Sequence, residues 1–313
     1  MDKIGADGVK AELTEKQLPE NAINALADFI AAGEVTLDAV AARCADPAIA
    51  DDLKYVLATA NAMAAGRYQA AVIVGTVAVA GLVVLDSLAL YLLGLAALVG
   101  VGVYVRWRVN REFQTLIAII NTDCDAGKWR GVISRLREHD ARRRRARSLC
   151  DCYLAIADLE ELRPADALAR MSGLSFGRRS ALNVMLYQNR AVCASELRDA
   201  ATLDAALAAL RELVAGYRAG SKRRELAERQ LADLELSLKP REAWDAEDEA
   251  RARGRVEAAS SHREHVSWSL LLADRELLAG DAAAARRLLD ESGLAPMTPR
   301  AAARREALLA RLP

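Results

Sequence analysis

The chain has 313 residues, which is enough for two or three folded units. Only 4% of its residues are aromatic and seven are proline. Alanine, leucine, arginine and glutamate, the best helix formers, dominate most of the chain, so the composition argues against an all-β fold and predicts an all-α one. Lysine plus arginine equals aspartate plus glutamate at 43 each, which is not the cationic excess of a dedicated nucleic-acid binder.

The cysteines and the N-terminus bear on the compartment. Five cysteines are an odd number and are scattered through helical stretches, which predicts reduced thiols and a cytosolic setting for the parts outside a membrane. The first residues lack the basic-then-apolar pattern of a signal peptide. Residues 1–68 hold 6 Lys/Arg and 11 Asp/Glu, whereas residues 106–313 hold 37 and 31, so the start of the chain is acidic.

Residues 1–66 are predicted to form a small acidic helical region. Apolar residues in 21–32 recur at helical spacing, and Gly33 ends that stretch. Thr36 suits the start of a second helix, and Pro47 suits the first turn of a third. Nothing in this region has the spacing of a catalytic motif.

Residues 70–105 form the most apolar block of the chain, interrupted only by Thr76, Asp86 and Ser87. A single helix of that length would extend roughly 54 Å, whereas the hydrocarbon core of a bilayer is about 30 Å thick. Folding back at Asp86 and Ser87 gives two arms of spanning length and moves the carboxylate to the far interface. We therefore expect residues 67–108 to form a transmembrane helical hairpin.

Aromatic and basic residues flank both arms and would anchor the hairpin at one interface. These expected anchors are Arg67, Tyr68, Tyr104, Arg106, Trp107 and Arg108. The positive-inside rule then predicts a two-span protein of the plasma membrane with both termini in the cytoplasm. Two alternatives are a buried hairpin of a non-membrane core and a functional Asp86 that couples to protons or ions within the bilayer.

Residues 109–313 repeat one pattern, in which an apolar helix, a short turn and a second helix follow one another. The turns are centred near Gly127, Arg163, Asp199, Pro240 and Gly280, at spacings of 36, 36, 41 and 40 residues. A period of this size is typical of helical repeat proteins. A non-repeating helical bundle is the alternative.

The pattern over residues 112–292 resembles the tetratricopeptide-type helical repeats, whose unit is about 34 residues. Small residues stand where paired helices of that family touch, at Ala191, Ala205, Ala273 and Ala284. The units are longer than the family's and lack its regular Trp, Tyr and Pro positions. The resemblance implies an α-solenoid whose concave surface binds proteins or peptides without chemistry.

Three polar patterns are candidates for chemistry. His262 and His265 share a helix face, but no further ligand has matching spacing, so surface polar residues are the favoured interpretation over a metal site. Cys150 and Cys152 do not form a Cys-x-x-Cys motif and are expected to be packed thiols rather than a redox sensor. The strongest charge run comprises Arg142, Arg143, Arg144, Arg145 and Arg147. It is interpreted as a solvated surface or as a contact for anionic lipid or an acidic partner, with nucleic acid disfavoured.

No phosphate-binding glycine loop, nucleophile elbow or kinase motif is present, so we expect no enzyme, cofactor, metal or small-molecule substrate. The leading hypothesis is a membrane-anchored helical-repeat scaffold that binds protein partners at the cytoplasmic face. An accessory subunit of a transporter or translocation complex, acting through the hairpin, is the alternative. A signalling protein with a ligand-sensing acidic head is a third hypothesis.

Overall fold

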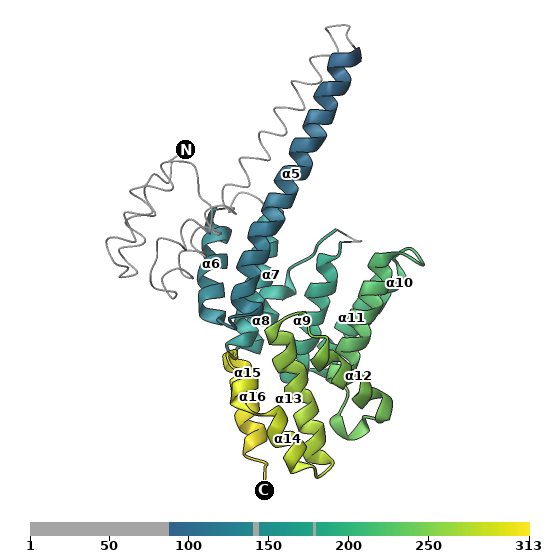
Figure 1. Cartoon of the computed structure of the whole chain (residues 1–313). Helices are drawn as coiled ribbons and strands as arrows, with labels where there is room; N and C mark the ends of the chain where they lie inside the picture. The colour runs from purple at the N-terminus through teal and green to yellow at the C-terminus, as the bar shows by residue number, and fades with distance from the viewer. Residues whose placement is uncertain (1–87, 140–143, 178–179) are drawn as a thin grey trace, which may run out of the picture. The chain divides into compact units, whose positions relative to one another are not determined.

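The computed structural model describes residues 88–139, 144–177 and 180–313, and every regular element in those ranges is a helix (Figure 1). The all-α prediction is therefore confirmed for the described residues. In chain order the elements are α5 (Leu88–Asn121), α6 (Ala126–His139), α7 (Arg144–Glu160), α8 (Pro164–Ser172), α9 (Leu182–Glu196), α10 (Ala200–Ala215), α11 (Lys222–Leu238), η2 (Arg241–Ala243), α12 (Ala246–Glu257), α13 (His262–Leu278), α14 (Ala282–Leu288), α15 (Glu291–Leu294) and α16 (Pro299–Leu309).

The predicted transmembrane hairpin is wrong. In the part of the chain that the structure describes, no helix combines the length and the apolarity that crossing a bilayer requires. The expected second arm does not end near residue 105 but continues as α5 through an arginine-bearing stretch to Asn121, with Ile119 and Ile120 buried near its end. The two-span plasma-membrane location and the cytoplasmic placement of both termini depended on the hairpin and are withdrawn with it.

Several of the predicted features fall on residues that the structure does not describe. The first arm of the hairpin and its turn at Asp86 and Ser87 lie outside the described residues, as do Arg67 and Tyr68. The acidic region 1–66 lies outside them too. The chain divides into two compact units, Met1–Leu116 and Ile117–Pro313, and the second contains the features described below.

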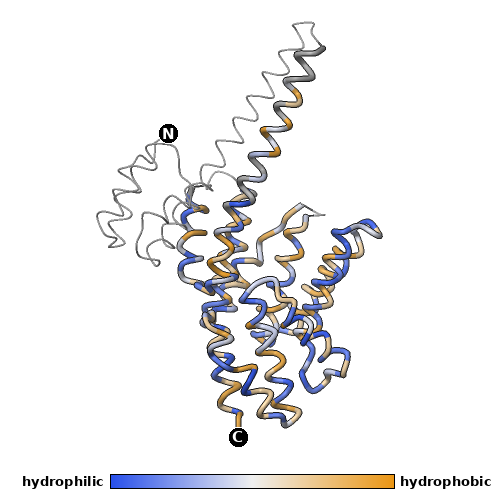
Figure 2. The backbone as a smooth tube through the Cα atoms, in the orientation of Figure 1, coloured by the Kyte–Doolittle hydropathy of each residue, from blue (hydrophilic) through white to orange (hydrophobic). Residues whose placement is uncertain are grey.

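Residues 117–313 bury their apolar side chains in a series of small cores, each formed by consecutive helices. Helices α7, α8 and α9 share a core around Met171 and Leu186, and α9, α10 and α11 share one around Leu210. The next joins α11 to α13 through Trp244 and Trp268. The last joins α13 to α16. Figure 2 shows that hydrophobic and hydrophilic residues alternate along these helices. Cores shared by neighbouring helices are typical of repeat architectures. Helix α16 departs from this pattern, because it also contacts α7.

The turns after α7, α9 and α13 share one conformation. Leu162, Arg198 and Gly280 adopt positive φ angles of 62°, 56° and 84°. In each turn the next residue donates its backbone N–H to a carbonyl five positions earlier, at 2.8–2.9 Å. This is a Schellman-type end of one helix directly before the next. In the turns that begin α10 and α14, Asp199 and Asp281 then accept from backbone amides of the new helix.

These turns coincide with the predicted ones near Arg163, Asp199 and Gly280, and the predicted turns near Gly127 and Pro240 also fall at helix boundaries. Two of the four expected small contact residues, Ala191 and Ala273, are fully buried. The other two are displaced by one position, because Ala206 and Ala285 are buried instead of Ala205 and Ala284. Membership of the tetratricopeptide class stays a prediction.

Candidate binding cavity

A cavity of about 790 Å³ opens among the C-terminal ends of α7, α9 and α11 and the facing sides of α13 and α16. The helices meet there because α16 returns to the start of the array and packs against both α7 and α13. Thr298, the N-cap of α16, donates its hydroxyl to Glu160 Oε2 at 2.7 Å and fixes this return. The volume lies within the range of about 300–1,000 Å³ found for ligand sites.

The cavity wall is mixed. Apolar side chains from α9, α11 and α13 contribute Val192, Leu238 and Leu270, while hydroxyls come from Ser195 and Ser267. Charged side chains provide the rest of the polar surface. The basic ones are Lys239, Arg241, Arg263, Arg300 and Arg304, and the acidic ones are Glu160, Glu196, Glu242 and Asp274.

Two of the arginines are paired within the cavity. Arg263 Nη1 lies 3.1 Å from Glu160 Oε1, and Arg263 Nε donates to Asn121 Oδ1 at 3.2 Å. Arg300 Nε donates to Glu196 Oε1 at 2.5 Å, and its Nη1 lies 3.7 Å from Glu160. These two side chains connect α13 and α16 to α7 and α9. These two guanidiniums therefore stabilise the cavity wall, and Glu160 and Glu196 compensate their charges.

Arg241 is buried, with 8% of its surface exposed, and its contacts are not carboxylates. It donates to the carbonyls of Leu236 and Ser237 at the end of α11, and its guanidinium lies 4.3 Å from the centre of the Trp244 ring. Burial, followed by repulsion from Arg304, lowers the pKa of Arg241 to about 10. The end of a helix offers only about half of an elementary charge, so the cation is incompletely compensated.

Arg304 lies one turn after Arg300 on α16 and faces the same cavity. Among the described residues it forms no ion pair or hydrogen bond. Arg304 is an exposed residue, and desolvation by the neighbouring protein and then the charge of Arg300 lower its pKa. Asp274 is near, but its carboxylate is 2.5 Å from Arg311 Nη1. Glu196, which also attracts Arg304, is paired with Arg300. Within the described ranges, Arg304 is therefore a cation without a carboxylate of its own at ion-pair distance.

Glu160 and Cys124 add little reactivity to the wall. Glu160 is buried and already accepts from Thr298 and Arg263. Burial raises the pKa of the Cys124 thiol to about 11, so at neutral pH it is the protonated, weakly nucleophilic form. The cavity as described favours binding through charge and apolar contact rather than covalent chemistry.

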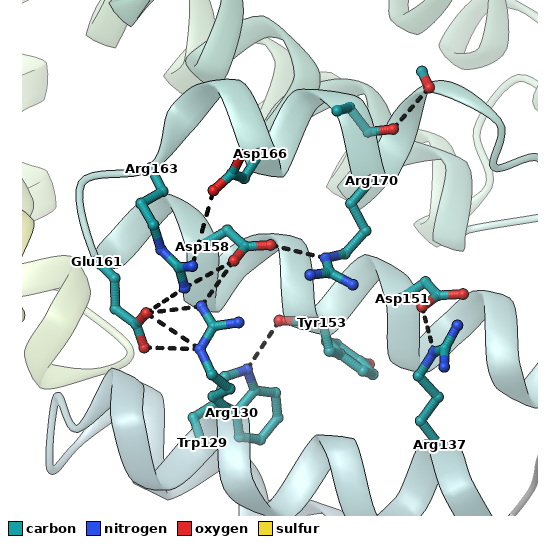
Figure 3. Close-up of polar contacts among 12 residues, drawn as sticks. Trp129, Arg130, Arg137, Asp151, Tyr153, Asp158, Glu161, Arg163, Asp166 and Arg170 are labelled. Carbon is teal, nitrogen blue, oxygen red and sulfur yellow. Dashed lines mark hydrogen bonds and ion pairs between the residues drawn. The ribbon is translucent and has the colours of Figure 1, made fainter.

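A second polar cluster surrounds Asp158 (Figure 3). The Asp158 carboxylate is fully buried and is 2.8 Å from Arg130 Nη2, 3.0 Å from Arg163 Nη2 and 2.8 Å from Arg170 Nε. Glu161 shares Arg130 and Arg163. Burial acts to raise the pKa of Glu161, but the hydrogen bond and charge of Arg130, reinforced by Arg163, lower it overall. The cluster joins α6, α7 and α8.

The residues singled out from the sequence lie elsewhere. Tyr104 and Trp107 are exposed on α5, with ring centroids 6.2 Å apart; Arg106 and Arg108 lie on the same helix. Arg142 and Arg143 lie outside the described residues. Arg144, Arg145 and Arg147 belong to the first turn of α7, with Arg144 and Arg147 exposed, whereas the cavity is at the opposite end of that helix, about 24 Å away.

The histidine and cysteine candidates are engaged structurally. His262 Nε2 contacts the carbonyls of Leu294 and Pro296 at 3.0 and 2.9 Å, and His265 Nδ1 contacts the carbonyl of Val256 at 3.2 Å. Cys150 and Cys152 are buried cysteines. Within the described ranges, no group of three or more His, Cys, Asp or Glu side chains is arranged to hold a metal ion.

Reasoning from the sequence missed the cavity arginines. Arg304 lines the cavity, Arg305 donates to the Leu289 carbonyl and Arg311 pairs with Asp274. No local signal separates these three arginines, because their roles depend on how α16 packs against distant helices.

Comparison with known protein families, with curated proteins and with solved structures finds no match for this chain.

Proposed function

We propose that this chain is a helical-repeat binding protein that recruits a protein partner by holding a segment of it in the cavity between α7, α9, α11, α13 and α16. The observation that carries the proposal is the cavity itself, a space of about 790 Å³ with mixed apolar and charged walls. Alternate helices of the array, α7, α9, α11 and α13, enclose it together with α16, and the concave side of a helical solenoid is likewise lined by one helix of each pair.

The resemblance to tetratricopeptide-type repeats supports the same proposal, since that architecture binds peptides on its concave surface. The shared turn conformation after α7, α9 and α13 is consistent with repeated helix pairs. No chemistry is proposed for the cavity, because its buried acid is paired and its thiol is protonated. The alternative as a transporter subunit relied on the transmembrane hairpin and is not pursued.

The test is photo-crosslinking from inside the cavity in the full chain. A photoreactive amino acid replaces Ala303, which lines the cavity, and a control protein carries it at Arg229, an exposed position of α11 away from the lining. We expect a partner segment to be crosslinked from position 303 and not from position 229, and Ser195→Trp, which fills the cavity, to abolish the product. Equal crosslinking from both positions, or none from position 303, contradicts the proposal.

A further inference from the structure

The cavity holds more positive charge than its own carboxylates neutralise. The paired arginines, Arg263 and Arg300, account for Glu160 and Glu196. Lys239 forms an ion pair with Asp248, which is not among the residues that line the cavity. What remains is Arg304, which has no ion-pair or hydrogen-bond partner among the described residues, and Arg241, which is held by two carbonyls and a tryptophan ring.

The nearby acids do not cancel this charge. Asp274 attracts both Arg241 and Arg304 but is engaged by Arg311. Glu196 also attracts Arg304 but is paired with Arg300, and Asp248 attracts Arg241 but is paired with Lys239. Glu242 is an exposed carboxylate that attracts Arg241. Despite these four acids, the balance still disfavours the charged form of both guanidiniums. Two guanidiniums that repel each other in a partly desolvated space are stabilised by an anion placed between them.

We propose that Arg304 and Arg241 form a carboxylate-binding subsite, so that the partner segment held in the cavity carries an acidic residue next to apolar ones. This inference rests on the proposed function and adds the chemical class of the segment. A guanidinium can bind a carboxylate through two parallel N–H···O hydrogen bonds. The apolar wall from Val192, Leu238 and Leu270 accommodates the neighbouring side chains, which a free inorganic anion would leave uncovered.

Arg304 is the residue to change, because Arg241 also caps α11 and its loss would disturb the fold. Arg304→Gln removes the charge and keeps most of the side-chain volume, and Arg304→Lys keeps the charge without the planar fork. Arg287→Gln is the matched control: Arg287 is an exposed arginine on α14 that does not line the cavity, so the change in net charge is the same.

The experiment selects binders for the full chain from a phage-displayed library of random short peptides. We expect peptides with Asp or Glu next to apolar residues to be enriched on the wild type and on Arg287→Gln, but not on Arg304→Gln. For one enriched peptide measured by calorimetry, we expect Arg304→Gln to weaken binding by about tenfold or more, and replacing the peptide's acid by its amide to have a similar effect. Arg304→Lys should recover part of the affinity.

Three results would overturn the subsite. They are enrichment of neutral or basic peptides, enrichment that Arg304→Gln leaves unchanged, and failure to enrich any peptide. Citrate tests the other source of the same chemistry: if it binds as tightly as the selected peptide and displaces it fully, the ligand is a free carboxylate and not a protein segment. A neutral segment crosslinked from position 303 would leave the proposed function standing while the carboxylate subsite fails.

Discussion

Asp158 shows how much one buried charge can determine. Its carboxylate has no access to solvent and serves three arginines, from α6, from the turn after α7 and from α8. Removing one partner from a buried ionic network leaves the remaining charges uncompensated, and this costs more than the ion pair itself contributes. The first helices of the 117–313 unit therefore depend on this side chain.

We expect Asp158→Asn to lower the free energy of unfolding by about 3–5 kcal/mol, because three guanidiniums lose their shared negative charge. Asp166→Asn is the control, since that carboxylate is mostly exposed and lies 3.8 Å from Arg163. It should change stability by less than about 0.5 kcal/mol. Urea unfolding of both variants measures the difference, and similar losses in the two would refute a special role for Asp158.

The buried thiols predict a loss of stability in alkali. Burial raises the pKa of Cys152 from its ordinary value of 9.0 to about 12. Above pH 9 the unfolded chain releases this proton while the folded chain retains it, so the free energy of unfolding falls as pH rises, by about 1.4 kcal/mol per unit for this group. Below pH 9 both states are protonated and the thiol contributes no slope.

Urea titrations between pH 8 and pH 10.5 check this, with Cys152→Ala as the comparison. Cys193 and Cys124 have raised pKa values as well, so the wild type and the variant should both lose stability in alkali, and the variant should do so less steeply. Identical slopes for the two proteins would show that Cys152 titrates alike in the folded and unfolded states.

The turns after α7, α9 and α13 each contain a residue in the left-handed conformation, which has a conformational free-energy cost for any residue other than glycine. Leu162 and Arg198 take a left-handed conformation that Gly280 adopts without a Cβ penalty. For a residue with a side chain this conformation costs on the order of 1–2 kcal/mol. The backbone of Arg198 is therefore strained because arginine carries a Cβ, and a glycine in the same turn would not bear this cost.

Arg198→Gly should raise the free energy of unfolding by about 0.5–1 kcal/mol, because the relieved strain exceeds the extra entropy of glycine in the unfolded chain. Arg198 is exposed and no hydrogen bond is lost from its side chain. Ala209→Gly, in the middle of α10, is the control and should destabilise by up to about 1 kcal/mol. Thermal unfolding distinguishes the two, and destabilisation by Arg198→Gly would contradict the interpretation of the turn.

At the level of the whole 117–313 unit, the return of α16 both closes the array and supplies the charge of the cavity. Arg300 and Arg304 lie one turn apart on the same helix but differ in their ion-pair partners. Arg300 bridges Glu196 and Glu160. Among the described residues, the two acids that attract Arg304, Asp274 and Glu196, are each paired with another arginine. Binding residues that do not stabilise the free protein are expected at functional sites.

We therefore expect Arg300→Gln to lower the free energy of unfolding by about 1–3 kcal/mol, because it leaves carboxylates without their charged partner. Arg304→Gln should not lower it, since the substitution removes a repulsion with Arg241 and Arg300. Parallel urea unfolding of the two variants and of Arg287→Gln measures this contrast. A loss for Arg304→Gln as large as for Arg300→Gln would mean that Arg304 has a structural partner.

The sequence by itself determined the helical class of the described residues and the positions of the turns, because both follow from local periodicity, caps and helix-ending residues. Gly280 with Asp281 marks its turn in the sequence, and the turns near Arg163 and Asp199 were also predictable. The local sequence pattern did not determine the structure that contains residues 88–105. An apolar run shows that burial or insertion is favoured, but it does not show that α5 continues to Asn121 and ends among buried residues.

Only the tertiary structure decided which charges meet. Two ion pairs, Glu160 with Arg263 and Glu196 with Arg300, each join positions more than a hundred residues apart. One turn of α16 separates the paired Arg300 from Arg304, which has no such partner among the described residues. Helical spacing assigns a residue to a face, but the partner of that face is set by how distant helices pack. The interior position of Asp158 and the charge of the cavity follow from that packing.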